Sequence, residues 1–185
     1  EQLAGLRAIP NLNVFRPADI NETLECWQIA LKSEHTPSAI ALSRQKLPYV
    51  NPSHTKENKS ELGAYVVKST SEDSAVTLIA SGSEVELALQ AQKELKEINI
   101  ESKVVSMPCQ ELFDQQSKGY KDKIINKNVP VITIEASSLC SWEKYSKNNM
   151  SINTFGESAP FKEVYKHFNL TSAKIIELTK KIIKE

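Results

Sequence analysis

The sequence has few cysteines and histidines. Its three cysteines, Cys26, Cys109 and Cys140, are widely spaced and odd in number. This argues against a disulfide framework and favours a reducing compartment such as the cytoplasm. There is no CxxC pair, and the three histidines are scattered, so no local motif offers ligands for a metal ion.

An excess of charge and a long apolar run are also missing. The chain of 185 residues carries 23 Lys plus Arg and 23 Asp plus Glu, so its formal net charge is zero. Nucleic acids and anionic membranes are therefore not the expected partners. The run Val129 to Ile134 is among the longest apolar stretches, and it is far too short to span a bilayer. We expect a soluble protein whose partner is a small molecule or another protein.

The stretch from Val76 to Pro108 predicts a strand, a helix and a second strand. Its ends, VTLIAS and SKVVSM, are short apolar runs rich in β-branched residues, as in strands buried in a parallel sheet. Apolar residues of the middle part recur at the helical period: Leu87, Ala88, Ala91, Leu95 and Ile98. Ser81 and Ser83, each followed three residues later by Glu, fit the capping-box pattern. The unit predicts a right-handed crossover and an α/β fold.

Residues 1–50 predict a smaller unit of the same kind. A strand from Asn11 to Phe15 precedes a helix that Asp19 or Asn21 caps, and a second strand covers Ser38 to Ser43. The apolar side of the helix is expected to consist of Leu24, Cys26, Trp27, Ala30 and Leu31. One helix and two strands cannot bury a sufficient core. We therefore expect an incomplete unit, the tail of a larger domain whose beginning is absent.

Residues 51–61 predict a linker and residues 62–185 a second domain, because the polar stretch from Leu47 to Glu61 lacks periodicity. The strand GAYVVK is joined to the next strand by a loop too short for a parallel crossover, so it should be an antiparallel edge strand. We predict a three-layer α/β/α domain with a five-stranded mixed sheet. Its later elements are expected as a helix at 109–125, a strand at 129–137, a helix at 139–147, a strand at 151–155 and helices at 160–168 and 171–185.

Arg44 is the best-placed candidate for ligand binding. It follows a predicted buried strand, at the edge of a parallel sheet where α/β folds bind ligands, and a guanidinium holds phosphate with two hydrogen bonds. The turn Ser81 to Ser83 could hold a phosphate, but helix capping is the simpler interpretation. Glu135 and Glu157 at a sheet edge suggest capping or an interface. The three histidines, His35, His54 and His167, are expected on the surface.

Four strings in this order resemble the C-terminal portion of a bacterial-type transketolase. They are LRAIPNLNVFRPAD from Leu6, ALSRQKLP from Ala41, IASGSEVELAL from Ile79 and TFGESAP from Thr154. The resemblance covers essentially the whole chain, and the combination is specific to that family among thiamine diphosphate enzymes. Lys46 departs from the family pattern, which has Asn after Arg-Gln.

The resemblance implies a homodimeric enzyme that binds thiamine diphosphate with a divalent cation, Mg²⁺ or Ca²⁺. It transfers a two-carbon ketol unit between sugar phosphates. Residues 1–50 would end the pyrimidine-binding domain, and residues 62–185 would be the transketolase C-terminal domain. Arg44, in the family's SRQ motif, would bind the substrate phosphate. No catalytic, cofactor or metal residue carries over, since the family's lie upstream of Glu1, so we expect this chain alone to be inactive and to bind no cofactor.

Two other hypotheses remain open from the sequence. The chain could be a non-enzymatic α/β module for dimerisation or scaffolding, or a nucleotide-binding module that uses the turn Ser81 to Ser83. The enzyme hypothesis predicts a run close to GPTHQPV immediately before Glu1, which the other two do not.

Overall fold

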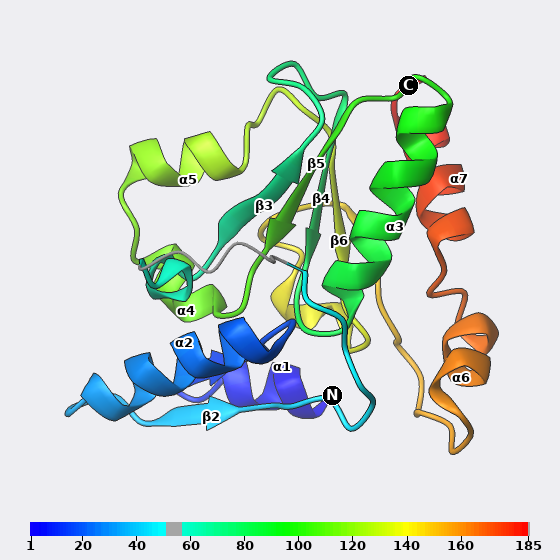
Figure 1. Ribbon diagram of the computed structural model, residues 1–185. Helices are drawn as coiled ribbons and strands as arrows, with labels where there is room; N and C mark the ends of the chain where they lie inside the picture. The colour runs from blue at the N-terminus through cyan, green and yellow to red at the C-terminus, as the bar shows by residue number, and fades with distance from the viewer. Residues whose placement is uncertain (51–56, 185) are drawn as a thin grey trace.

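The computed structural model describes residues 1–50 and 57–184, which form two sheets (Figure 1). His54 and residues 51–56 of the predicted linker at 51–61 therefore lie outside the described residues. The smaller sheet comes from the first 50 residues, and the larger one from the rest of the chain. The two parts are in contact along one end of the larger sheet (Figure 1).

The first part contains two parallel strands and two helices. Helix α1 (Gln2–Arg7) precedes strand β1 (Asn13–Phe15), helix α2 (Ile20–Lys32) and strand β2 (Ser38–Ile40). The strands pair in parallel, with Val14 opposite Ala39. Asp19 caps α2, as one of the two predicted alternatives states. Helix α1 was not predicted from the sequence, and both strands are shorter than expected.

The larger sheet has five strands in the order β3-β5-β4-β6-β7. Their bounds are β3 (Tyr65–Ser69), β4 (Val76–Ala80), β5 (Ser102–Ser106), β6 (Val131–Ile134) and β7 (Asn148–Met150). Strand β3 runs antiparallel to β5, while the other pairs are parallel. The predicted mixed sheet with an antiparallel edge is thus confirmed.

Helices cover both faces of this sheet, which confirms the three-layer prediction (Figure 1). Helices α3 (Glu84–Glu97) and α7 (Ser172–Ile182) pack on one face, where Leu78 and Leu95 belong to the main apolar cluster. Helices α4 (Gln110–Asp114) and α5 (Lys118–Ile124) cover the other face together with η2 (Leu139–Ser141). Strand β4 is buried on both faces, since Leu78 and Ile79 point into different clusters.

Several predicted elements differ from the observed ones. The helix expected at 109–125 is split into α4 and α5, because the Ser117 hydroxyl accepts a hydrogen bond from Tyr120 N and starts a second helix. The helix expected at 139–147 is only the short 3-10 helix η2. Pairing with β6 places strand β7 before the expected 151–155. Helix α6 (Phe161–His167) lies within the predicted range.

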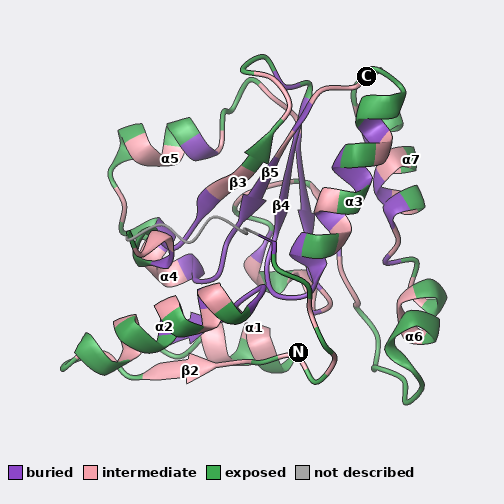
Figure 2. Ribbon diagram, viewed as in Figure 1, coloured by how far each residue is buried: buried purple, intermediate pink, exposed green. Residues whose placement is uncertain are grey.

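The predicted apolar side of α2 is wrong. Only Cys26 of the five predicted residues is buried, while Leu24 and Trp27 are about half exposed and Leu31 is 78% exposed. Figure 2 shows that much of α2 is exposed or only partly buried. The side chain that reaches the larger sheet is Glu22, to which Tyr65 and Ser106 donate hydrogen bonds. An apolar stripe consequently lies on the outer side of this helix.

No helix in the described part of the chain combines the length and apolarity that crossing a membrane requires.

Candidate functional site

Arg44 lies in the loop that follows strand β2, at the carboxyl end of the two-stranded parallel sheet. At the start of this loop, Ala41 N donates a hydrogen bond to Phe15 O of strand β1 over 2.8 Å. The side chain of Arg44 is exposed, and no described residue accepts a hydrogen bond from it or forms an ion pair with it. Arg44 thus lies beyond the carboxyl end of β2, with its guanidinium exposed, but β2 ends at Ile40 and is half-buried, whereas the sequence predicted a buried strand up to Ser43.

The other end of this loop is held by Asp19. Its Oδ2 accepts a hydrogen bond from Val50 N at 3.0 Å, while Oδ1 accepts from Glu22 N at 2.9 Å and caps α2. Asp19 is 4% exposed, so both hydrogen bonds are shielded from water. One carboxylate therefore joins the start of a helix to the end of the Arg44 loop.

Glu22, one turn into α2, connects this helix to the larger sheet. Its Oε1 accepts hydrogen bonds from Tyr65 Oη at 2.7 Å and Ser106 Oγ at 2.5 Å, and its Oε2 accepts from Ala18 N at 2.7 Å. Burial raises the pKa of Glu22 to about 7, although the three hydrogen bonds oppose the rise. The carboxyl links strands β3 and β5 to the N-terminal end of α2.

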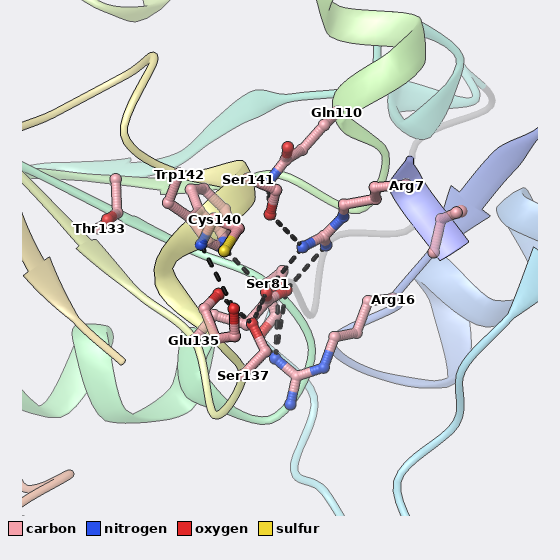
Figure 3. A network of polar contacts seen from close by, with 12 residues as sticks. Arg7, Arg16, Ser81, Gln110, Thr133, Glu135, Ser137, Cys140, Ser141 and Trp142 are labelled. Carbon is pink, nitrogen blue, oxygen red and sulfur yellow. Dashed lines mark hydrogen bonds and ion pairs between the residues drawn. The ribbon is translucent and has the colours of Figure 1, made fainter. Parts of the chain in front are cut away.

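Two arginines of the first part reach the carboxyl ends of β4 and β6 (Figure 3). Arg7 donates from both terminal nitrogens to Glu135, over 2.7 and 2.8 Å. Trp142 Nε1 donates to the same carboxylate at 2.7 Å, and the hydroxyls of Ser81 and Ser137 donate to it as well. Burial alone would raise the pKa of Glu135, but Arg7 and Arg16 hold it well below its ordinary value.

Arg16 occupies the turn between β4 and α3. Its guanidinium donates to Ser81 O at 2.9 Å and forms an ion pair with Glu84, while Gly82 N donates to Arg16 O at 2.9 Å. Burial opposes the charge of Arg16, yet the neighbouring carboxylates of Glu84 and Glu135 raise its pKa. Tyr165 also donates to Glu84, so α6 joins the same network.

This network fills the position where open α/β sheets bind ligands. After β4 the chain forms β5, which lies on one side of β4, and then β6, which lies on the other side. The direction in which strands are added therefore reverses between β4 and β6. Gly82 N and the Ser81 hydroxyl already donate to Arg16 and Glu135. The nucleotide hypothesis is not supported, because Arg16 covers the turn that it requires. The predicted capping box is also wrong: Ser83 is the N-cap of α3, but its side chain forms no capping hydrogen bond.

The remaining candidates lie apart from this network. His35, His167 and Glu157 are exposed, and Lys46 is exposed in the same loop as Arg44. Glu135, by contrast, belongs to the network and lies where the two parts of the chain meet, in agreement with the interface alternative for this residue. Sequence reasoning missed Arg7, Arg16 and Glu22, although the first two lie in one of the strings that carry the resemblance.

Comparison with known proteins identifies both parts of the chain. The model for the transketolase pyrimidine-binding domain matches residues 1–50, and the model for the transketolase-like C-terminal domain matches residues 63–171. The transketolase of Sinorhizobium medicae strain WSM419 is 45% identical over 180 residues, which are 95% of this chain and 26% of that protein. The chain belongs to the transketolase family.

Solved transketolase structures agree with the fold described above. Transketolase from Leishmania mexicana superposes with a TM-score of 0.92 at 40% identity, over 100% of this chain and 27% of that one. A transketolase complex with sedoheptulose-7-phosphate from Pichia stipitis also gives 0.92, at 38% identity over 98% of this chain and 26% of that one. The chain spans about a quarter of the length of these transketolases.

Proposed function

We propose that the chain is part of a transketolase that transfers a two-carbon ketol unit from a ketose phosphate to an aldose phosphate, as in the pentose phosphate pathway. Arg44 would bind the substrate phosphate. The observation that carries this role is the exposed guanidinium of Arg44 on a loop anchored at both ends, beside a parallel sheet. A guanidinium matches the geometry of a phosphate with two parallel hydrogen bonds.

The proposal includes a division of labour along the chain. Residues 1–50 would end the pyrimidine-binding domain, 51–61 would be a linker, and 62–185 would form the C-terminal domain. We also propose that the whole enzyme is a cytoplasmic homodimer, in line with the resemblance. The contacts of Asp19, Glu22 and the two arginines support a C-terminal domain whose task is to hold the end of the pyrimidine-binding domain in place.

Thiamine diphosphate with a divalent cation, Mg²⁺ or Ca²⁺, would be the cofactor of the full-length enzyme. The described residues contain no group of three His, Cys, Asp or Glu side chains that could hold a metal ion. Arg7 and Arg16 are also neutralised by buried carboxylates. These residues do not fit a metal-diphosphate site, so the cofactor would bind outside them, and calorimetry on this chain with thiamine diphosphate and Mg²⁺ should show no saturable heat.

A second candidate is a dimerisation or scaffolding module without catalysis. It is favoured by the apolar stripe on the outer side of α2, where Leu24, Trp27 and Leu31 are exposed. Sedimentation of the chain at several concentrations tests this candidate. Concentration-independent monomers would argue against it.

The phosphate role is tested by replacing Arg44 in the full-length enzyme. With hydroxypyruvate as donor, Arg44→Ala should lower kcat/KM for an aldose phosphate acceptor by about 10- to 150-fold. This loss corresponds to the net contribution of a charge-assisted hydrogen bond, about 1.5–3 kcal/mol. Glycolaldehyde, which has no phosphate, should lose much less. Arg44→Lys should recover part of the loss, since an ammonium cannot make two parallel hydrogen bonds.

Lys46 supplies a neighbouring comparison in the same loop. Lys46→Asn should lower kcat/KM for phosphorylated acceptors only if its charge reaches the same phosphate. Equal losses for both acceptors in Arg44→Ala would mean that Arg44 supports the fold and does not bind phosphate.

A further inference from the structure

We propose that Asp19 is a positioning residue for Arg44, and that Glu22 connects Asp19 to the larger sheet by hydrogen bonds. The inference rests on the proposed phosphate-binding role of Arg44. It assigns a task to a side chain that does not touch the substrate. Its starting point is the pair of hydrogen bonds that Val50 N and Glu22 N donate to the carboxylate of Asp19, over 3.0 and 2.9 Å.

The loop that carries Arg44 is fixed at its two ends and exposed between them. Ala41 N donates a hydrogen bond to Phe15 O at one end, and Val50 N donates one to Asp19 Oδ2 at the other. Between these ends Leu42, Arg44 and Lys46 are exposed. Because a bidentate contact depends on placement within about 1 Å, holding both ends limits where the guanidinium can lie.

The far anchor is part of the protein core. Val50 is 8% exposed and packs in the main apolar cluster with Ala18 and residues of β4. Asp19 and Glu22 are 4% and 2% exposed, so neither carboxylate can exchange its partners for water at low cost. Release of Val50 N would leave a buried donor unpaired.

The larger sheet contributes to this anchor through Glu22. Tyr65 of β3 and the Ser106 hydroxyl of β5 donate to Glu22 Oε1. Glu22 N in turn donates to Asp19 Oδ1, which leaves Oδ2 for Val50 N. The C-terminal domain thereby supports the Arg44 loop through the side chains of Glu22 and Asp19. It does so without contact with the substrate.

Only a side chain with two acceptors can perform both tasks of Asp19. Serine caps helices well but has a single short hydroxyl, so Asp19→Ser should keep the cap and lose the bond to Val50 N. Asparagine keeps one acceptor and turns an N–H toward one of the two donors, so it should give an intermediate effect.

The test is kinetic and uses the full-length enzyme. Asp19→Ser should raise KM for an aldose phosphate acceptor by about 3- to 20-fold, up to the worth of about one net hydrogen bond, with little change in kcat. The loss in kcat/KM for glycolaldehyde should be several times smaller. In the Arg44→Ala background, Asp19→Ser should add no further selective loss, because the residue that it positions is gone.

A second measurement reads the loop directly. Hydrogen exchange should accelerate in peptides that cover residues 41–50 of the Asp19→Ser variant, while peptides from the middle of α2 stay protected. Thr171→Ala is the matched control, because Thr171 caps α7 by accepting from Lys174 N and lies outside the Arg44 loop. It should show neither the selectivity nor the faster exchange.

The outcomes separate this inference from the proposed function. If Arg44→Ala is selective for phosphorylated acceptors but Asp19→Ser is not, or if residues 41–50 exchange unchanged, the positioning role is overturned alone. Additive losses in the double variant overturn it as well. If Arg44→Ala itself shows no selectivity, the phosphate role fails and the positioning role fails with it.

Discussion

Arg7 and Glu135 form a two-bonded ion pair between the first part of the chain and the end of strand β6. The nitrogens Nη1 and Nη2 lie 2.7 and 2.8 Å from the two carboxylate oxygens. The two side chains are only 4% and 0% exposed. A buried pair of this kind is costly to break on one side, because the remaining charge loses its main partner and is shielded from water.

Arg7→Ala should therefore lower the free energy of unfolding by about 3–5 kcal/mol. Arg16, 3.7 Å from Glu135, remains but is also paired with Glu84. Urea unfolding of the chain measures the loss. The control is Lys174→Ala, which breaks an exposed pair with Glu177 and should change stability by no more than about 0.5 kcal/mol. Equal losses in the free energy of unfolding for Arg7→Ala and Lys174→Ala would contradict the argument that burial makes the first pair costly to break.

Gly63 should be the least replaceable glycine of the described residues. Its φ is +76°, and a Cβ there would lie 2.1 Å from Phe113 N and 2.5 Å from Cys109 O. Backbone atoms of α4 would have to move, so Gly63→Ala should cost about 3 kcal/mol or more. Thermal unfolding checks this prediction.

Gly119 is the matched control for Gly63. It lies in α5, and nothing stands within 4 Å of a Cβ at this position. Gly119→Ala should stabilise the chain by up to about 1 kcal/mol, because alanine favours the helix. A similar melting temperature for both variants would show that the contact at Gly63 relaxes easily.

The larger sheet was predictable because its signals are local. Strands β4 and β5 are apolar runs on either side of a helix with the helical period, and the loop after β3 is too short for a parallel crossover. The family strings also located the Arg44 loop. None of these inferences depended on knowing which distant residues meet.

The buried polar network could not be predicted, because its partners lie far apart in sequence. Arg7 and Glu135 are separated by 128 residues, and Ser106 and Glu22 by 84. A charged residue at such positions is ordinarily assigned to the surface. For the same reason the sequence placed the apolar side of α2 inward, whereas tertiary contacts bury Glu22 and expose Leu31.

Glu22 should make stability depend on pH in the neutral to weakly acidic range. Its pKa is about 7 in the folded chain and 4.5 without the fold, so the folded state binds more protons between these values. The free energy of unfolding should then fall as pH rises from 4.5 to 7, by up to about 1.4 kcal/mol per pH unit and about 3 kcal/mol in all. Below pH 4.5 the carboxyl is protonated in both states, and its contribution is constant.

Glu22→Gln separates this effect from the other carboxylates. The amide is neutral at every pH, and its oxygen and nitrogen can still bond to Ala18 N and to the hydroxyls of Tyr65 and Ser106, which can accept as well as donate. The descent between pH 4.5 and 7 should therefore flatten in urea unfolding. Glu135 has the opposite sign, since Arg7 and Arg16 lower its pKa, and its contribution is lost only as pH falls below the ordinary value of 4.5. Glu135→Gln should thus lower stability at every pH, because it leaves Arg7 without its partner, but it should change the pH dependence of stability only below about pH 4.5. Parallel profiles for the wild type and Glu22→Gln would refute the assignment to Glu22.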